Sequence, residues 1–298
     1  MQKTLWKATA LVGASALIIF MLSAMLSTVA AAPKGNNSTT ETLKGADFAI
    51  YSGSGTWNES IRAFESVLRW KGLTYEEIGP RDVNTKNLSA LYKGIFMPGG
   101  WAAYYLKWIN SDGEQHIRDL IRNGGAYIGA SAGAYYASDK VIWEGKEYDY
   151  RLDLFKGKAV GPIPEIAPWP SYTMTVMSMD KSHPANTYEP AERAVLYYGE
   201  PYFEPFAGQE MLAIARWNVP QNPAADKTPG IITFNYGKGR VALYGPHPEI
   251  EEDSSRDGSN WADELSDGPD GSDWNNLWAA LDWLMFRPIS KSPDIPDI

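Results

Sequence analysis

The sequence contains no cysteine among its 298 residues and only three histidines. The absence of cysteine excludes disulfides, thiolate metal sites and a cysteine nucleophile. Any site that needs an imidazole base must therefore use His116, His183 or His247. Basic residues are also in the minority, with 27 Lys and Arg against 36 Asp and Glu and a net charge of -9. This balance argues against nucleic acid as a partner.

The first 32 residues differ from the rest of the chain. Lys3 and Lys7 precede an uncharged apolar run, residues 8–32, which ends in three alanines before Pro33. The small residues are typical of a signal-peptidase site, whereas the length of the run suffices to cross a bilayer, so cleavage and retention both stay open. In either case the positive-inside tendency places the following residues outside the cytoplasm. We expect an extracytoplasmic protein, secreted or anchored to the membrane by residues 1–32.

The rest of the chain is predicted to form one α/β domain at residues 44–287, after a polar linker at 33–43 and before a flexible tail at 288–298. The whole sequence is 44% hydrophobic, which is sufficient for a core. A segment rich in proline and aromatic residues, about 141–207, interrupts the pattern as an insertion near the site. An acidic segment, about 251–273, lacks the spacing of a calcium-binding EF-hand loop, so we expect a solvated loop and predict no metal or cofactor.

Short apolar runs alternate with helical spacing along the domain. Strands are predicted at residues 46–51, 73–78, 92–97, 126–130, 211–217, 230–235 and 241–244, with helices at 114–122 and 274–286. Strands separated by helices imply right-handed crossovers and a parallel sheet covered on both faces. The predicted fold is a doubly wound, mostly parallel α/β sheet, which binds ligands at the carboxyl ends of its strands.

A Gly-x-Ser-x-Gly motif, Gly129–Gly133, lies between a predicted strand and a predicted helix. This context is the one that a nucleophile elbow requires, because the strand turns sharply into the helix and exposes the serine hydroxyl. Ser131 is the candidate nucleophile, and the N–H group of Ala132 faces a developing oxyanion. The neighbouring strand ends in Gly99-Gly100, and we expect the Gly100 N–H group to complete the oxyanion hole.

His247 is the histidine placed to act as the base. It follows a predicted strand and therefore shares an edge of the sheet with Ser131, whereas His116 lies on a predicted helix and His183 in a proline-containing loop. Glu249, two residues later, is placed to orient the imidazole. A turn with a hydrogen-bonded histidine is the structural alternative. The order serine, histidine, acid differs from the serine, acid, histidine order of α/β-hydrolases.

Four segments together resemble the class I glutamine amidotransferase-like superfamily, and within it the branch of the biotin-protein ligase N-terminal domain. They are residues 97–100, 124–135, 197–199 and 245–249. The resemblance implies a flavodoxin-like fold and a triad in which Ser131 takes the place of the family's cysteine. It does not imply biotin ligation, because the sequence shows no Gly-rich ATP loop.

These residues favour an exported hydrolase that cleaves an amide, peptide or ester bond of a small molecule or peptide through Ser131, His247 and Glu249. The predicted substrate contacts come from Gly99, Trp101, Tyr135 and Tyr198. One alternative is a catalytically inactive binding module of the same fold. The other is a glutamine amidotransferase subunit, which would need a synthase, although no obligatory protein partner is evident.

Two further features carry weaker expectations. The aromatic residues of the insertion are expected to serve mainly in packing, with at most a third in contact with a ligand: Trp143, Tyr148, Tyr150, Trp169, Tyr172, Tyr197, Tyr198 and Tyr202. Glycosylation sequons occur at Asn36, Asn37, Asn58 and Asn87, and an extracytoplasmic location would make them usable.

Overall fold

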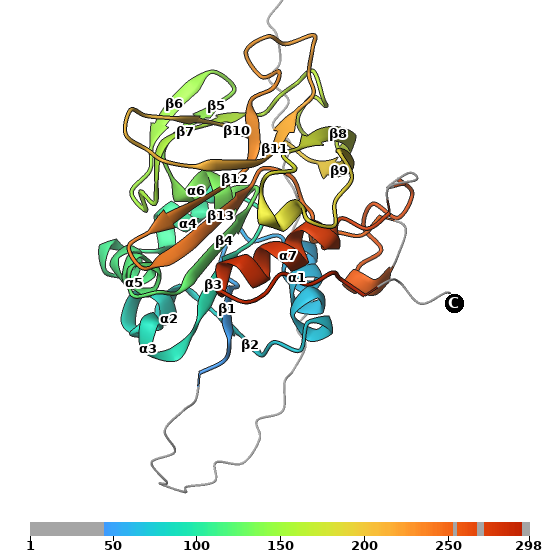
Figure 1. Ribbon diagram of the computed structural model, residues 1–298. Helices are drawn as coiled ribbons and strands as arrows, with labels where there is room; N and C mark the ends of the chain where they lie inside the picture. The colour runs from blue at the N-terminus through green and yellow to red at the C-terminus, as the bar shows by residue number, and fades with distance from the viewer. Residues whose placement is uncertain (1–44, 253–254, 267–270, 294–298) are drawn as a thin grey trace, which may run out of the picture. The chain divides into compact units, whose positions relative to one another are not determined.

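The computed structural model describes residues 45–252, 255–266 and 271–293 (Figure 1). The predicted N-terminal segment 1–32, the linker 33–43 and the sequons Asn36 and Asn37 lie outside these residues, as does the end of the predicted tail. Within the described part of the chain, no helix combines the length and apolarity needed to cross a membrane.

One half of the main sheet is parallel. Its strands lie in the order β2 (Tyr75–Ile78), β1 (Phe48–Tyr51), β3 (Gly94–Met97), β4 (Ala126–Ala130) and β13 (Gly239–Tyr244). Every residue of β1, β3 and β4 is buried. Continuous apolar runs are expected for parallel strands that are covered on both faces, which is why the sequence identified these strands.

Helices cover both faces of this sheet (Figure 1). One apolar cluster joins alternate strand residues to α1 (Asn58–Trp70) and α7 (Trp274–Leu284), and a second joins the intervening residues to α5 (Ser111–Arg122). The second cluster also receives α2 (Pro80–Thr85), α3 (Leu88–Leu91) and α4 (Ala102–Trp108). The predicted doubly wound α/β class is therefore confirmed.

The other half of the nine-stranded sheet is antiparallel. Beyond β13 it continues with β12 (Pro229–Tyr236), β11 (Leu212–Trp217), β8 (Thr173–Met179) and β9 (Glu192–Tyr197). A hairpin turn joins β12 to β13, with Gly237 at a φ of 61°. The sheet is thus mixed, and a short 3-10 helix, η1 (Pro184–Asn186), lies between β8 and β9.

The insertion is more ordered than the sequence indicates. It supplies β8 and β9 to the main sheet, and most of a second sheet in the order β10 (Tyr202–Pro205), β7 (Phe155–Gly161), β5 (Ser138–Trp143) and β6 (Lys146–Asp149). Strand-like runs at residues 173–179 and 194–198 of the sequence correspond to β8 and β9, whereas the strands of the second sheet were not predicted. All four residues of β6 are exposed, so the strand forms by pairing with β5 and leaves no apolar pattern in the sequence.

The expectation of a solvated acidic loop at 251–273 was wrong for part of this segment, although Asp263 and Glu264 are exposed. The carboxylates of Glu251, Glu252, Asp257 and Asp273 are buried, and Arg256 contacts Glu251 at 2.7 Å beside the 3-10 helix η2 (Ser255–Asp257). Burial of charge depends on partners that the local sequence does not reveal. In the ranges that the structure describes, no group of three or more acidic or histidine side chains is suited to hold a metal ion.

Candidate functional site

Ser131 lies at the turn between β4 and the short helix α6 (Ala132–Ala137). Its φ of 45° and ψ of -104° lie outside the regions that most residues adopt. Its N–H group donates to the Tyr244 carbonyl at 2.9 Å, and its own carbonyl accepts from Ala134 and Tyr135. These bonds hold the strained turn, which is the geometry of a nucleophile elbow.

The two glycines of the elbow are needed because backbone passes close to both. A Cβ atom on Gly129 would lie 2.6 Å from the Gly133 carbonyl carbon and oxygen. A Cβ atom on Gly133 would lie 2.0 Å from the Met97 carbonyl oxygen, on the neighbouring strand β3. Since neither neighbour is the end of a flexible side chain, backbone must shift if either glycine gains a methyl group.

We expect Gly133→Ala to lower the free energy of unfolding by about 2–4 kcal/mol, because the added methyl group overlaps backbone. Thermal unfolding followed by circular dichroism measures the loss. Gly79→Ala is the matched control, since no heavy atom lies within 4 Å of its added Cβ and its φ is -93°. Equal melting temperatures for the two variants would contradict the tight elbow.

The predicted oxyanion donors are available. Gly100 and Thr56 form an isolated antiparallel β-bridge. In its two hydrogen bonds, the Trp57 N–H group donates to the Gly99 carbonyl and the Trp101 N–H group donates to the Gly55 carbonyl. The N–H groups of Gly100 and Ala132 donate to no other described residue, and both residues line the same cavity as Ser131. Two donors beside one hydroxyl suit a carbonyl or carboxylate oxygen.

Gly99 has a different role from the predicted substrate contact. It does not line the cavity, and its N–H group donates to Ser60 Oγ at 3.0 Å. A Cβ atom here would lie 2.4 Å from His247 Cε1, so the glycine makes room for the imidazole. Ser60 in turn donates to Glu249 Oε1 at 2.6 Å, and one network therefore joins the end of β3 to Glu249.

His247 is buried and lies between two carboxylates. Its Nδ1 is 2.9 Å from Glu249 Oε1, which agrees with the predicted orienting role of Glu249. Its Nε2, the atom that would accept the Ser131 proton, is 3.2 Å from Glu200 Oε1. No hydrogen bond joins Ser131 Oγ to His247 among the described residues. The structure therefore shows no hydrogen bond between the candidate nucleophile and its candidate base.

The charges around His247 also prevent its imidazole from acting as a base. Burial alone would lower its pKa, but the carboxylates of Glu249 and Glu200 outweigh burial and raise the pKa to about 10. Burial raises the pKa of Glu200, and its bond to His247 partly offsets this rise. At neutral pH the imidazole is thus protonated and has no lone pair to accept a proton from Ser131.

Glu200 is the site residue that sequence reasoning missed. It directly follows Tyr197-Tyr198-Gly199, one of the segments that carried the family resemblance, and is fully buried. The available signal was an acidic residue shortly after the apolar run at residues 194–198. Its pairing with His247 joins the end of β9 to the end of β13, which are not neighbours in the sheet, so no local pattern predicts it.

The high pKa of His247 makes stability depend on pH. The folded chain binds this proton up to about pH 10, whereas the unfolded chain releases it near 6.5. The stabilisation is therefore complete below pH 6.5 and is lost as pH rises toward 10, by at most about 1.4 kcal/mol per pH unit. Urea unfolding between pH 6.5 and 9.5 measures this slope. His247→Gln should flatten it, and an unchanged slope would contradict the assignment.

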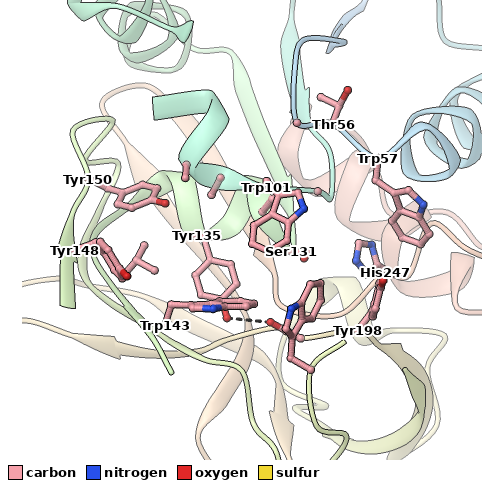
Figure 2. A pocket seen from close by; sticks show the side chains of 18 of the residues that line it. Thr56, Trp57, Trp101, Ser131, Tyr135, Trp143, Tyr148, Tyr150, Tyr198 and His247 are labelled. Carbon is pink, nitrogen blue, oxygen red and sulfur yellow. Dashed lines mark hydrogen bonds between the residues drawn. The ribbon is translucent and has the colours of Figure 1, made fainter. Parts of the chain in front are cut away.

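A cavity of about 630 Å³ opens above Ser131 (Figure 2). Nine of its nineteen lining residues are aromatic: Trp57, Trp101, Tyr135, Trp143, Tyr148, Tyr150, Trp169, Tyr198 and Trp261. Three of the predicted substrate contacts line this cavity: Trp101, Tyr135 and Tyr198. The Tyr135 hydroxyl donates to the Gly199 carbonyl at 3.0 Å. Five of the eight insertion aromatics line the cavity, and which of them contact a ligand stays a prediction.

The other two histidines lie outside the cavity. His183 is buried with Nε2 2.9 Å from Thr233 Oγ1, and burial lowers its pKa to about 4. His116 Nδ1 is 2.8 Å from the Val83 carbonyl oxygen. Both are engaged in local structure, so His247 is the histidine of the site, as position along the chain indicated.

Known proteins match the chain over most of the domain. Residues 46–267 match the model of a protein family whose description is biotin-protein ligase, N terminal. A biotin–protein ligase of Schizosaccharomyces pombe is 26% identical over 230 residues, which are 69% of this chain and 34% of that protein. An uncharacterized protein of Chlamydia muridarum is 32% identical over 162 residues, 52% of this chain and 60% of that protein. The chain thus spans less than two thirds of either relative.

A solved structure described as a glutamine amidotransferase shares the fold. It has a TM-score of 0.51 at 17% identity and covers 74% of this chain and 98% of that chain. At this identity the likeness concerns the arrangement of strands and helices alone. It confirms the predicted amidotransferase-like, flavodoxin-type architecture.

Proposed function

The chain belongs to the biotin-protein ligase N-terminal family, and from this premise we propose that its cavity binds a small organic molecule without forming a covalent bond to it. A carbonyl or carboxylate oxygen of that molecule accepts hydrogen bonds from the N–H groups of Gly100 and Ala132 and from the Ser131 hydroxyl. The aromatic walls contact the rest of the molecule. This proposal corresponds to the alternative of a catalytically inactive binding module. It uses the same residues that were predicted to form the hydrolase site.

The contact between His247 Nε2 and Glu200 Oε1, at 3.2 Å, carries this proposal. Serine is a weak nucleophile unless a neighbouring base removes its proton. Here the only cavity-lining histidine of the described residues is protonated and directed at a carboxylate. Ser131 therefore serves as a hydrogen-bond donor, and the strained turn serves to hold that donor beside two N–H groups.

Binding is tested by titrating a set of small carboxylates, esters and amides while recording the tryptophan fluorescence of the wall. We expect saturable changes for some of them. Ser131→Ala should weaken the binding by about 2- to 12-fold, the effect of one hydrogen bond of about 0.5–1.5 kcal/mol. Intact-mass spectrometry should find no covalent adduct. The proposal is rejected if no molecule of the set binds, or if a stable acyl-enzyme forms on Ser131.

The second candidate function is the serine-dependent hydrolase. The strained φ of 45° at Ser131 and the two unengaged N–H groups favour it, because acyl transfer uses both features. It requires a substrate that separates His247 Nε2 from Glu200. A fluorophosphonate probe that labels wild-type protein, and neither Ser131→Ala nor His247→Ala, would establish this candidate over the first.

We also propose that the chain acts outside the cytoplasm, on the basis of Lys3, Lys7 and the apolar run 8–32. The N-terminal peptide identified by mass spectrometry in membrane and soluble fractions distinguishes a retained anchor from a cleaved signal. Asn58 and Asn87 are exposed in the structure, so glycosylation can reach both. Full-length protein confined to the cytosol would contradict the proposal.

A further inference from the structure

We propose that the wall formed by Trp101, Trp143 and Trp169 binds a methylated ammonium group, tertiary or quaternary, of the molecule whose oxygen lies at Ser131. This inference rests on the proposed function and names the ligand class. Trp143 and Trp169 belong to the insertion, and Trp101 is the residue that precedes α4. The wall therefore forms the part of the cavity that these segments line.

The three indoles contact one another at steep angles. Ring centroids lie 6.1 Å apart for Trp101 and Trp143 with an interplanar angle of 53°, and 5.5 Å apart for Trp101 and Trp169 with an angle of 86°. Trp143 and Trp169 lie 5.4 Å apart at 78°. The wall is therefore a corner of non-parallel rings. A flat ligand can stack on one of these rings only, whereas a rounded methylated group can touch several.

Neighbouring rings extend the corner toward Ser131. Tyr135 meets Trp143 edge to face at 5.7 Å, and Tyr198 stacks on Trp169 at 5.1 Å. All five residues line the one cavity, and Figure 2 shows Trp101, Tyr135, Trp143 and Tyr198 gathered beside Ser131. A single small molecule can therefore meet both the aromatic corner and the oxygen-binding donors.

The charges near the wall favour a cation. The lining residues include no lysine, arginine, aspartate or glutamate. The ammonium of Lys146 lies 5.0 Å from the ring of Tyr148, and no such contact involves Trp101, Trp143 or Trp169 among the described residues. The buried set of His247, Glu200 and Glu249 carries one net negative charge when all three are ionised. Aromatic faces are themselves negative and attract desolvated cations within about 6 Å. An anion at the same wall would meet these faces unfavourably.

A matched pair of esters tests the proposal. Acetylcholine carries a trimethylammonium group, and 3,3-dimethylbutyl acetate has the same shape with an uncharged carbon in place of the nitrogen. We expect acetylcholine to bind at least tenfold more tightly to the full chain in calorimetric titrations, because cation–π attraction is present in one ester alone. Trp143→Leu and, separately, Trp169→Leu should remove this preference, while the weaker binding of the neutral ester changes by less than about threefold.

Trp108→Leu is the control, because Trp108 lies on α4 with 46% exposure and does not line the cavity. It should keep the tenfold preference, and circular dichroism checks the fold of each variant. Equal or tighter binding of the neutral ester would overturn the inference and leave the proposed function intact. If only uncharged or anionic molecules bind, the inference is likewise overturned and the proposed function stays intact. A chain that binds neither ester and no member of the wider set would overturn both.

Discussion

Replacing Glu200 with alanine should lower the pKa of His247 and make Ser131 reactive. The loss of one of two neighbouring carboxylates lowers a histidine pKa by about 1–3. With a pKa of about 10, about one imidazole in a hundred is neutral at pH 8. A pKa lower by two would make about half neutral, so labelling of Ser131 by a fluorophosphonate should accelerate by about 50-fold.

Glu200→Gln is the matched variant, because it removes the charge and keeps a polar group beside His247 Nε2. It should lower the pKa of His247 with a smaller gain in labelling than alanine gives. Titration of the His247 ring protons by NMR measures the pKa, and Ser131→Ala gives the labelling background. An unchanged pKa in Glu200→Ala would show that Glu200 does not hold the proton. A lowered pKa without labelling would place Ser131 out of reach of His247 and reject the hydrolase candidate.

Replacing Arg193 with methionine should lower the free energy of unfolding by about 3–5 kcal/mol. The Arg193 Nε atom is 2.7 Å from Glu189 Oε2 and 3.8 Å from Asp273 Oδ1, and the three side chains are at most 2% exposed. Methionine fills a similar length of the core but leaves two buried carboxylates without this cation. The cost is the loss of this cation beside two buried carboxylates, and chemical unfolding at pH 7 measures it.

Arg122→Met is the control for this charge effect. Arg122 pairs with Asp119 at 2.5 Å, but the two side chains are 48% and 42% exposed. Water solvates both partners there, so the loss should stay within about 1 kcal/mol. A small effect at Arg193 would mean that Glu189 or Asp273 takes up a proton in the variant. In that case the stability difference between the two variants should grow as the pH rises.

Much of the fold could be predicted because its strands are buried on both faces. Continuous apolar runs marked β1, β3 and β4, and the alternation with helical spacing indicated the parallel order. The second sheet could not be predicted in this way. Strand β6 is exposed along its whole length, and β5 buries only Ser138 and Val141, so pairing between strands defines both. Such pairing leaves no periodic signal in one sequence.

The site was predictable where it depends on backbone conformation. The spacing of Gly129, Ser131 and Gly133 specified the elbow, because a methyl group on either glycine would overlap backbone. The positions of Gly100 and Ala132 followed from the ends of the same strands. The protonation of His247 did not follow, because it depends on Glu200 and on burial, and both arise only when distant segments meet.

The family, the elbow and the edge of the sheet where the site lies could all be derived from the amino-acid sequence, since these depend on short segments and on the order of strands. The surroundings of His247 and the aromatic wall could be derived only from the folded chain. Folding brings Glu200 to His247 Nε2 and assembles tryptophans from separate segments into one wall. Charge and proton affinity depend on distance in space and on exclusion of water, which neighbouring residues in the chain do not specify.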